Sequence, residues 1–385
     1  MKAANLEEVA AIVANFEING GFSDAVPFGS GHINDTYRIT NSYAACPDYV
    51  LQRVNHEIFK NVPALIDNIS YVTDHLRNKF STLMGSANVG DRALTLIPAK
   101  SGQYYYQDAK GQYWRLYLFL PDTRSYDVVT TTQQALEGGK ALGQFQNYLA
   151  DLDVSKLSVV LPDFHNINFR LKQFAEAIQN NAAGRLDEVA AEVAFVRARE
   201  HGMGEIERLG DAGKLPLRVT HNDTKFNNIL FDANDRAQCI IDLDTIMPGY
   251  MAFDFGDAVR TLINTAPEDE PDLDKIQLNI PVFKAFAQGF LGQTASYMST
   301  TELRSLTLGI TLLPFIMGLR FLTDYINGDT YYKTAFPAHN LQRARAQFNL
   351  VEKLEKAHHQ LYAIVMHAAE VGMSHTHAKS NEFEG

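Results

Sequence analysis

One stretch, residues 217–244, limits what this chain can fold into more than any other part of the sequence. Within it, residues 229–231 are apolar and predict a short β-strand. Residues 232–235 read Asp-Ala-Asn-Asp, which is typical of a turn, and the apolar run 239–241 predicts the returning strand. Such a hairpin would carry Asp242, at the end of its second strand, back to the residues that precede its first.

Four polar residues stand before this hairpin at the spacing H-x-D-x-K-x-x-N: His221, Asp223, Lys225 and Asn228. The hairpin brings Asp242 beside Asn228, so an amide and a carboxylate oxygen converge, which suits Mg²⁺. Phosphoryl transfer from ATP needs metal ligands, a carboxylate for the acceptor hydroxyl and a cation that offsets developing charge. The sequence therefore predicts Asp223 as the base and Lys225 as the cation. It predicts Asn228 and Asp242 as metal ligands and places His221 in the same catalytic motif.

This motif resembles the catalytic loop of protein kinases, and it is more similar to that of the aminoglycoside phosphotransferase group, which reads H-x-D-x-x-x-x-N followed by Ile-Asp. The resemblance implies a two-lobed, protein-kinase-like α+β fold that uses ATP and Mg²⁺. We expect residues 1–120 to form a small, sheet-containing nucleotide-binding lobe. We expect residues 121–385 to form a larger, mainly helical lobe with the catalytic loop and the acceptor pocket. The break at Leu120-Pro121-Asp122 marks the hinge.

A glycine loop precedes a strand-like alternation near the N-terminus. Its Gly29 and Gly31 permit close backbone approach, although an ordinary hairpin turn would use the same glycines. The run G-x-x-N-x-T-Y that begins at Gly31 resembles the nucleotide loop of the same group, which implies that Gly29, Gly31 and Asn34 contact ATP. His32 is either an exposed turn residue or a contact to the acceptor.

Residues 49–55 predict the following strand, which in protein kinases carries a lysine that pairs with the ATP phosphates. Here Gln52 stands at the matching place, and strand alternation turns Arg53 to the other face. We therefore expect Gln52 beside the nucleotide, and the sequence does not show which group replaces the lysine.

Two further strands are predicted at residues 103–107 and 112–120, around a turn. Near the end of the second, Leu118 and Leu120 either flank the adenine ring or belong to a plain core strand.

Helical periodicity predicts eight helices, at residues 6–16, 62–80, 133–149, 169–180, 186–210, 280–292, 301–327 and 339–361. The end of the chain carries His367, His375 and His377, which belong either to a metal site or, as we expect, to a disordered tail. Asp254-Phe255-Gly256 imitates the metal-binding triplet of protein kinases. Because Asp254 lies beyond a further loop, we interpret it as a brace for the catalytic loop or a helix cap.

Arg320 and Asp324 stand one turn apart within the apolar helix 301–327. They form either a buried ion pair that fixes two helices or a polar wall of the acceptor pocket.

Four runs, at residues 31–34, 218–225, 240–249 and 320–322, resemble the N-acetylhexosamine 1-kinase family, anomeric sugar kinases within the phosphotransferase group. That resemblance implies phosphorylation of the C1 hydroxyl of N-acetylglucosamine or N-acetylgalactosamine. It implies sugar contacts from His32, Arg320 and Tyr331. Alternatives are a kinase of another hexose, homoserine or an amino alcohol, and a nucleotide-binding protein that has lost catalysis. The intact catalytic set argues against the last.

The net charge and the cysteine content restrict the classes of partner and the cellular location that we expect. The net charge of -11 disfavours nucleic acid and anionic membrane surfaces as partners. Only two cysteines occur, so a disulfide framework is not expected, and the acidic N-terminus does not predict a signal peptide. We expect a cytoplasmic enzyme, a monomer or weak homo-oligomer, whose partners are a small sugar and ATP.

Overall fold

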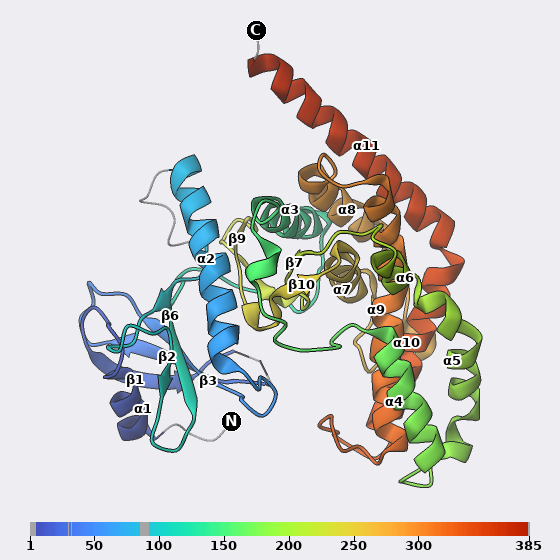
Figure 1. The fold of residues 1–385 in the computed structure, drawn as a ribbon, viewed down its shortest axis with the longest axis horizontal. Helices are drawn as coiled ribbons and strands as arrows, with labels where there is room; N and C mark the ends of the chain where they lie inside the picture. The colour runs from blue at the N-terminus through green and yellow to red at the C-terminus, as the bar shows by residue number, and fades with distance from the viewer. Residues whose placement is uncertain (1–4, 30, 32, 85–91, 384–385) are drawn as a thin grey trace.

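The computed structural model describes residues 5–29, 31, 33–84 and 92–383 and has two lobes (Figure 1). A small antiparallel sheet dominates the N-terminal lobe, and helices dominate the larger C-terminal lobe. The predicted protein-kinase-like α+β architecture is therefore confirmed.

The N-terminal sheet has the strand order β1-β2-β3-β6-β4, with β5 also paired to β6, and every pairing is antiparallel. Its strands are β1 (Phe22–Pro27), β2 (Asp35–Asn41), β3 (Tyr49–Val54), β4 (Leu96–Ile97), β5 (Tyr106–Gln107) and β6 (Tyr113–Leu118). Helix α1 (Leu6–Val13) packs on the sheet, because Val9, Ile12 and Val13 share a buried cluster with strand residues such as Leu51 and Leu116.

Two strands of this sheet, β1 and β4, were not predicted from the sequence, for a physical reason. β1 contains a bulge and buries only Ala25, so it shows no period-two alternation. β4 is only two residues long. The predicted strand at residues 103–107 is shorter than expected, because only Tyr106–Gln107 pairs with β6.

Helix α2 (Val62–Met84) joins the two lobes. Its buried side chains, including Leu65 and Ile69, belong to the same apolar cluster as much of the C-terminal lobe. Asn68 fixes the contact, because its Nδ2 donates to the carbonyl oxygens of Ser158 and Ile246, both at 2.8 Å. The two lobes therefore share one core along this helix.

The C-terminal lobe contains nine α-helices and four short strands within the described residues. The helices are α3 (Thr132–Tyr148), α4 (Ile167–Asn180), α5 (Ala190–Met203), α6 (Glu205–Asp211), α7 (Met251–Ile263), α8 (Ile280–Thr294), α9 (Thr300–Ile326), α10 (His339–Lys356) and α11 (His358–Phe383). The strands are β7 (Arg218–Thr220), β8 (Ile229–Phe231), β9 (Ala237–Ile240) and β10 (Met247–Gly249).

Two helices were predicted with the wrong extent, and the predicted disordered tail is wrong. The single helix expected at 186–210 is interrupted at Gly204, where α5 ends and α6 begins. The helix expected at 339–361 ends at Lys356, and α11 starts after one residue. The expected disordered tail is instead the continuation of α11, whose Leu361, Val365 and Ala368 are buried in the core.

Helix α9 runs through the middle of this lobe. Among the described helices it alone is long and apolar enough to cross a membrane, but 72% of its apolar window is buried inside the protein. That burial is what a core helix of a globular protein requires.

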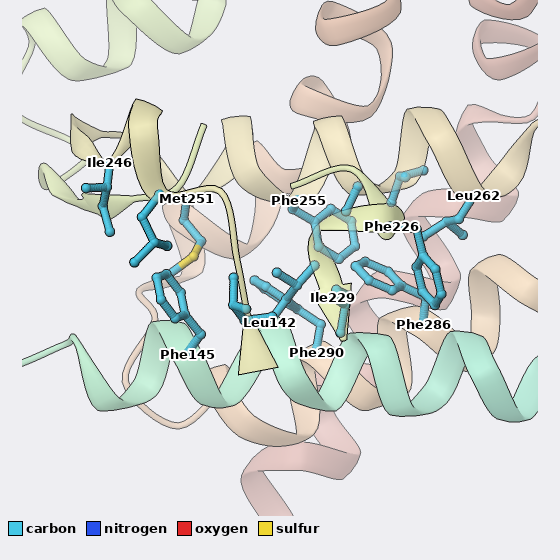
Figure 2. Close-up of a cluster of buried hydrophobic side chains, with 14 of the residues drawn as sticks. Leu142, Phe145, Phe226, Ile229, Ile246, Met251, Phe255, Leu262, Phe286 and Phe290 are labelled. Carbon is cyan, nitrogen blue, oxygen red and sulfur yellow. The ribbon is translucent and has the colours of Figure 1, made fainter. Parts of the chain in front are cut away.

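Close helix packing supports the catalytic hairpin. A side chain at Gly139 of α3 would come within 2.2 Å of the carbonyl oxygen of Phe286 on α8, so only glycine allows this approach. Figure 2 shows the result, in which Phe226 and Ile229 of the catalytic loop and hairpin pack with Phe290 and other apolar residues above α3. The hairpin therefore packs against this buried apolar cluster.

Candidate active site

The hairpin predicted from the sequence is present. β8 and β9 pair antiparallel with Ile229 opposite Ile240, and the N–H of Ile241 donates to the carbonyl of Asn228 at 2.9 Å. Asp242 therefore leaves β9 next to Asn228, as the turn chemistry predicted.

Asp254 of α7 holds the catalytic loop, residues 221–228, in place. The carboxylate of Asp254 accepts the backbone N–H groups of His221 at 2.9 Å and Asn222 at 2.7 Å, and the side-chain amide of Gln146 at 2.5 Å. Burial raises the pKa of Asp254 to about 6. Asp254 is 2% exposed and fully engaged, so its predicted role as a brace is confirmed.

His221 positions the loop and does not face the cleft. It is fully buried; its Nδ1 accepts the N–H of Asp223 at 3.2 Å, and its Nε2 lies 2.9 Å from the carbonyl oxygen of Ile241. Both ring nitrogens are therefore occupied in a neutral tautomer. The structure makes His221 a positioning residue, where its place in the motif had suggested a catalytic one.

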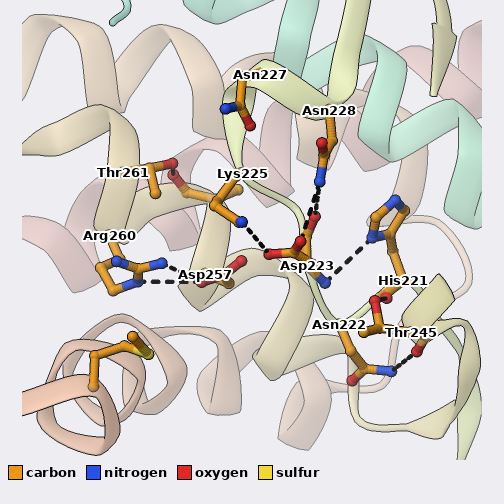
Figure 3. A network of polar contacts seen from close by, with 12 residues as sticks. His221, Asn222, Asp223, Lys225, Asn227, Asn228, Thr245, Asp257, Arg260 and Thr261 are labelled. Atoms are coloured by element: carbon orange, nitrogen blue, oxygen red, sulfur yellow. Dashed lines mark hydrogen bonds and ion pairs between the residues drawn. The ribbon is translucent and has the colours of Figure 1, made fainter. Parts of the chain in front are cut away.

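Asp223 lies at the centre of a small polar network (Figure 3). The Nζ of Lys225 is 3.1 Å from its Oδ1, and the Nδ2 of Asn228 donates to its backbone carbonyl at 2.8 Å. Burial works against the charge of Lys225, but Asp223 and Asp257 outweigh it and raise the pKa of Lys225. A carboxylate and a charged ammonium therefore lie together, the pairing that a phosphoryl-transfer site needs.

Two residues of the site, one in the catalytic loop and one after β9, have a strained backbone. Asn222 and Asp242 have positive φ angles of 64° and 60°. Asn and Asp tolerate this left-handed region better than most residues, and such conformations persist where the surrounding structure enforces them. The side chain of Asn222 is held by Thr220 and by the carbonyl of Thr245 at 3.0 Å.

Asp242 and Asn228 offer oxygen atoms for a divalent cation. Asn228 uses its Nδ2 on Asp223, which leaves its amide oxygen as the ligand atom. The side chain of Asp242 reaches water, yet crowding by the surrounding protein, followed by the charges of Asp244 and Asp223, raises its pKa to about 6. A divalent cation would relieve this repulsion.

The described residues contain no group of three or more His, Cys, Asp or Glu side chains that could hold a metal ion. A cation here would take few protein ligands and complete its shell with phosphate oxygens and water, which is typical of Mg²⁺. The residues present therefore fit a nucleotide-bound divalent cation, held by Asn228 and Asp242.

The glycine loop leads into β2 of the N-terminal sheet. Gly29 has a φ of 79°, and a side chain at Gly29 or Gly31 would meet nothing within 4 Å, so this backbone is open to a ligand. Asn34 reaches the other lobe, where its Nδ2 donates to Asp244 at 2.6 Å. His32 lies outside the described residues.

The other predicted nucleotide contacts are Gln52, Leu118 and Leu120, and they differ in how deeply they are buried. Gln52 faces the cleft side of the sheet and accepts from Arg115 of β6 at 2.9 and 2.8 Å. Leu118 is half-buried, but Leu120 is buried in the core that the two lobes share, as expected of a plain core residue.

Arg320, a predicted acceptor contact, is a cation without an acid partner among the described residues. The guanidinium of Arg320 lies over the rings of Phe164, Tyr331 and Tyr332, 5.5–5.9 Å from their centroids. Its one hydrogen bond to a described residue goes to the sulfur of Met317, at 3.8 Å. No carboxylate of the described residues forms an ion pair with it.

A short chain of contacts links Arg320 to Asp223. Phe164 lies against His165, with ring centroids 4.6 Å apart, and the Nε2 of His165 is 3.0 Å from the carbonyl oxygen of Asn222. Burial lowers the pKa of His165 to about 4, so its ring is neutral and donates to that carbonyl. The aromatic surface under Arg320 therefore begins beside Asp223, the predicted base.

A second arginine, Arg170, lies on the same side. It donates to Gln173 at 2.9 Å and to the carbonyl of Phe164 at 3.1 Å, while its buried Nε has no hydrogen-bond partner among the residues that the structure describes. Burial and then the charge of Arg320 lower the pKa of Arg170 to about 10. The buried hydroxyl of Tyr332 also has no hydrogen-bond partner in the described part of the chain.

Asp324 fills neither role predicted from the sequence, the ion pair with Arg320 or the polar wall of the acceptor pocket. Its carboxylate accepts the N–H groups of Thr330, Tyr331 and Tyr332 at 2.8–2.9 Å and the amide of Asn340 at 2.9 Å. Asp324 is 5% exposed and neither pairs with Arg320 nor faces the acceptor. It shapes the turn that presents Tyr331, whose side chain is largely exposed.

Sequence analysis missed four residues of this site, namely Arg115, Phe164, His165 and Arg170. The segment that carries the last three shows no motif, and Arg115 looks like an ordinary strand residue.

Fold and site together define a phosphotransferase of the protein-kinase-like class. The model of the Phosphotransferase enzyme family matches residues 24–287, which is more than half of the chain. The chain therefore belongs to this family.

Solved structures support the fold. An aminoglycoside phosphotransferase from Alicyclobacillus acidocaldarius superposes with a TM-score of 0.60 at 13% identity, covering 93% of this chain and 96% of that one. An amicoumacin kinase bound to AMP-PNP, Ca²⁺ and its antibiotic has a TM-score of 0.57 at 12% identity, covering 91% and 94%. A choline kinase from Cryptosporidium parvum has a TM-score of 0.56 at 16% identity, covering 92% and 97%.

Proposed function

We propose that this enzyme transfers the γ-phosphoryl group of ATP to the C1 hydroxyl of an N-acetylhexosamine in the cytoplasm. The proposal combines membership of the phosphotransferase family with the resemblance of residues 31–34, 218–225, 240–249 and 320–322 to N-acetylhexosamine 1-kinases. Similar folds are found with AMP-PNP and Ca²⁺, which supports ATP with a divalent cation, Mg²⁺ in the cell.

One observation carries the choice of acceptor. Arg320 and Arg170 face the acceptor side without acid partners among the described residues, next to the unpartnered hydroxyl of Tyr332. A cationic acceptor such as choline or an aminoglycoside would be repelled by them. A neutral polyhydroxyl compound would satisfy these donors, because its oxygens accept hydrogen bonds in several directions.

The chemistry follows from the residues around Asp223. Asp223 accepts the proton of the acceptor hydroxyl as that oxygen forms its bond to the γ-phosphorus and the bond to ADP breaks. Lys225, 3.1 Å from Asp223, offsets the negative charge that develops on the transferred group. A divalent cation held by Asn228 and Asp242 would orient the phosphates and neutralise their charge.

The test is ADP release from ATP and Mg²⁺ with a panel of acceptors. N-acetylglucosamine and N-acetylgalactosamine should be turned over, while choline, ethanolamine and kanamycin should not. The methyl glycoside of N-acetylglucosamine is the matched control, because its C1 oxygen is blocked and it should be inert. Turnover of that glycoside would exclude C1 as the reacting position, and turnover of choline would overturn the acceptor assignment.

The two arginines favour one second candidate. The carboxylate of homoserine would pair with Arg320 and Arg170, and its hydroxyl would then face Asp223. Homoserine therefore belongs in the panel, and its exclusive turnover would replace the sugar proposal.

A further inference from the structure

The cation that protein kinases place on β3 lies on the neighbouring strand in this chain. Arg115 of β6 stands opposite Gln52 of β3 in the strand register. Gln52 Oε1 accepts from Nε and Nη2 of Arg115 at 2.9 and 2.8 Å, and Gln52 Nε2 donates to Thr36 of β2 at 3.1 Å. Three adjacent strands thus fix the guanidinium on one face of the sheet.

The third nitrogen of Arg115 crosses to the other lobe. Its Nη1 lies 2.5 Å from Oδ1 of Asp244, and the two side chains are only 1% and 5% exposed. Asn34, beside the glycine loop, donates to Oδ2 of the same carboxylate at 2.6 Å. Because Asp244 follows Asp242 by two residues, this contact joins the sheet, the glycine loop and the metal-binding end of the hairpin.

The other candidates for this cation are accounted for. Arg53, next to Gln52, pairs with Asp35 on the opposite and more exposed face. In protein kinases the strand lysine pairs with a glutamate of the helix after it. Among the described residues no acid of α2 pairs with Arg115, and its acid partner is Asp244.

We propose that Arg115 is a positioning residue that replaces the strand lysine. Paired with Asp244, it holds the glycine loop and Asp242 at the separation that a metal-bound triphosphate requires. Loss of the guanidinium would leave Asp244 buried and unpaired beside Asp242, so the two carboxylates would repel each other and the loop would move. This inference rests on the proposed function as a metal-dependent kinase.

Calorimetry of AMP-PNP binding with Mg²⁺ tests the inference without an acceptor. Arg115→Met should weaken nucleotide binding about tenfold or more, because the buried pair is broken. Arg115→Met should also raise the Mg²⁺ concentration at which nucleotide binding is half-saturated. Arg115→Lys should recover part of the lost nucleotide affinity. Arg53→Met is the matched control, because it removes a cation from an exposed ion pair on the adjacent strand position, and its binding should stay within about twofold of wild type.

Two outcomes separate this inference from the proposed function. If the wild type does not bind AMP-PNP with Mg²⁺, the proposed function falls. If the wild type binds and Arg115→Met binds equally well, the role of Arg115 is overturned.

A second variant covers the case in which Arg115→Met does not fold. Asn34→Ala removes the other hydrogen bond to Asp244 without leaving a buried charge. It should weaken nucleotide binding severalfold with an unchanged melting temperature, and unchanged nucleotide binding would likewise overturn the proposal.

Discussion

Arg320 and Asp324 lie one turn apart on α9 and both contact Tyr331 and Tyr332, but Arg320 meets their rings whereas Asp324 accepts their backbone N–H groups. Asp324 accepts five hydrogen bonds, four from the following turn and one from Asn340. Arg320 lies over aromatic rings and has no acid partner among the described residues. Asp324, a buried acid that accepts backbone N–H groups, therefore has a structural role. Arg320, a cation that pairs with no acid of the described residues, is available to a ligand.

We predict that Arg320→Ala raises the KM for the acceptor about 10- to 100-fold and leaves the KM for ATP nearly unchanged. Loss of hydrogen bonds from a charged group costs about 1.5–3 kcal/mol, which corresponds to that range. Steady-state kinetics with each substrate varied in turn measures both constants. Asp324→Asn is the control and should lower the free energy of unfolding by about 2–4 kcal/mol. Equal damage to both KM values in Arg320→Ala would remove it from the acceptor pocket.

We predict that Asp223→Asn lowers kcat about 10²- to 10⁴-fold, the usual contribution of a positioned base. The isosteric amide keeps the loop in place, because Asn228 donates to the backbone carbonyl of Asp223 at 2.8 Å. Affinity for AMP-PNP, measured by calorimetry, should therefore stay close to the wild-type value. Near wild-type turnover would exclude Asp223 from proton transfer.

A pair of variants separates the two candidate metal aspartates. Asp242→Asn should raise the Mg²⁺ concentration needed for half-maximal activity, because it removes a charged ligand from the cleft. Asp254→Asn should leave that requirement unchanged and lower the free energy of unfolding by about 1–3 kcal/mol, because an amide cannot accept all the hydrogen bonds that Asp254 receives. A raised Mg²⁺ requirement in Asp254→Asn would reverse the assignment.

Local chemistry explains what could be predicted from the sequence. The β8–β9 hairpin follows from its apolar runs and turn residues, and the proximity of Asp242 to Asn228 follows from the hairpin alone. The brace at Asp254 was predicted because the hairpin already supplied a nearer aspartate. The hairpin relations span few residues and depend on backbone geometry, whereas the Asp254 brace joins residues that lie 32 and 33 positions apart.

The remaining site residues depend on pairings between distant segments. Arg115 meets Gln52 only because β6 lies beside β3, 63 positions away in the chain, and alternation gives the face of a strand but not its neighbour. Arg170 and Phe164 come from a segment without a motif, which packing of α4 against α9 brings to Arg320. Sequence periodicity predicted α4 but could not predict this contact.

We predict that Gly139→Ala lowers the free energy of unfolding by about 1–3 kcal/mol, as overpacking of a tight core does. Its Cβ would approach a backbone carbonyl of α8 to 2.2 Å, and backbone cannot move as a side-chain tip can. Gly292→Ala is the matched control on α8, because its Cβ would meet nothing within 4 Å. It should stabilise the protein by about 0.5–1 kcal/mol through helix propensity. Urea unfolding measures both, and equal effects of the two variants would contradict the packing account of α3 and α8.

We predict that His165 makes the folded protein sensitive to acid. Burial lowers its pKa from 6.5 to about 4, so below pH 6.5 the unfolded chain binds a proton that the folded chain resists. The stability that this histidine contributes is therefore present above pH 6.5 and is lost as the pH falls towards 4. The side chain is partly accessible, so we expect a loss of about 2 kcal/mol from this group.

Urea unfolding at pH 7, 6, 5 and 4 measures this contribution. His165→Gln keeps a donor for the carbonyl of Asn222 but cannot titrate, so its stability should fall less steeply with acid than that of the wild type. His367→Gln, at an exposed position on α11, is the matched control and should follow the wild-type curve. Parallel curves for the wild type and His165→Gln between pH 7 and pH 4 would show that His165 does not resist protonation. In that case its ring could be charged beside Asp223, and the neutral aromatic surface under Arg320 would have to be reassigned.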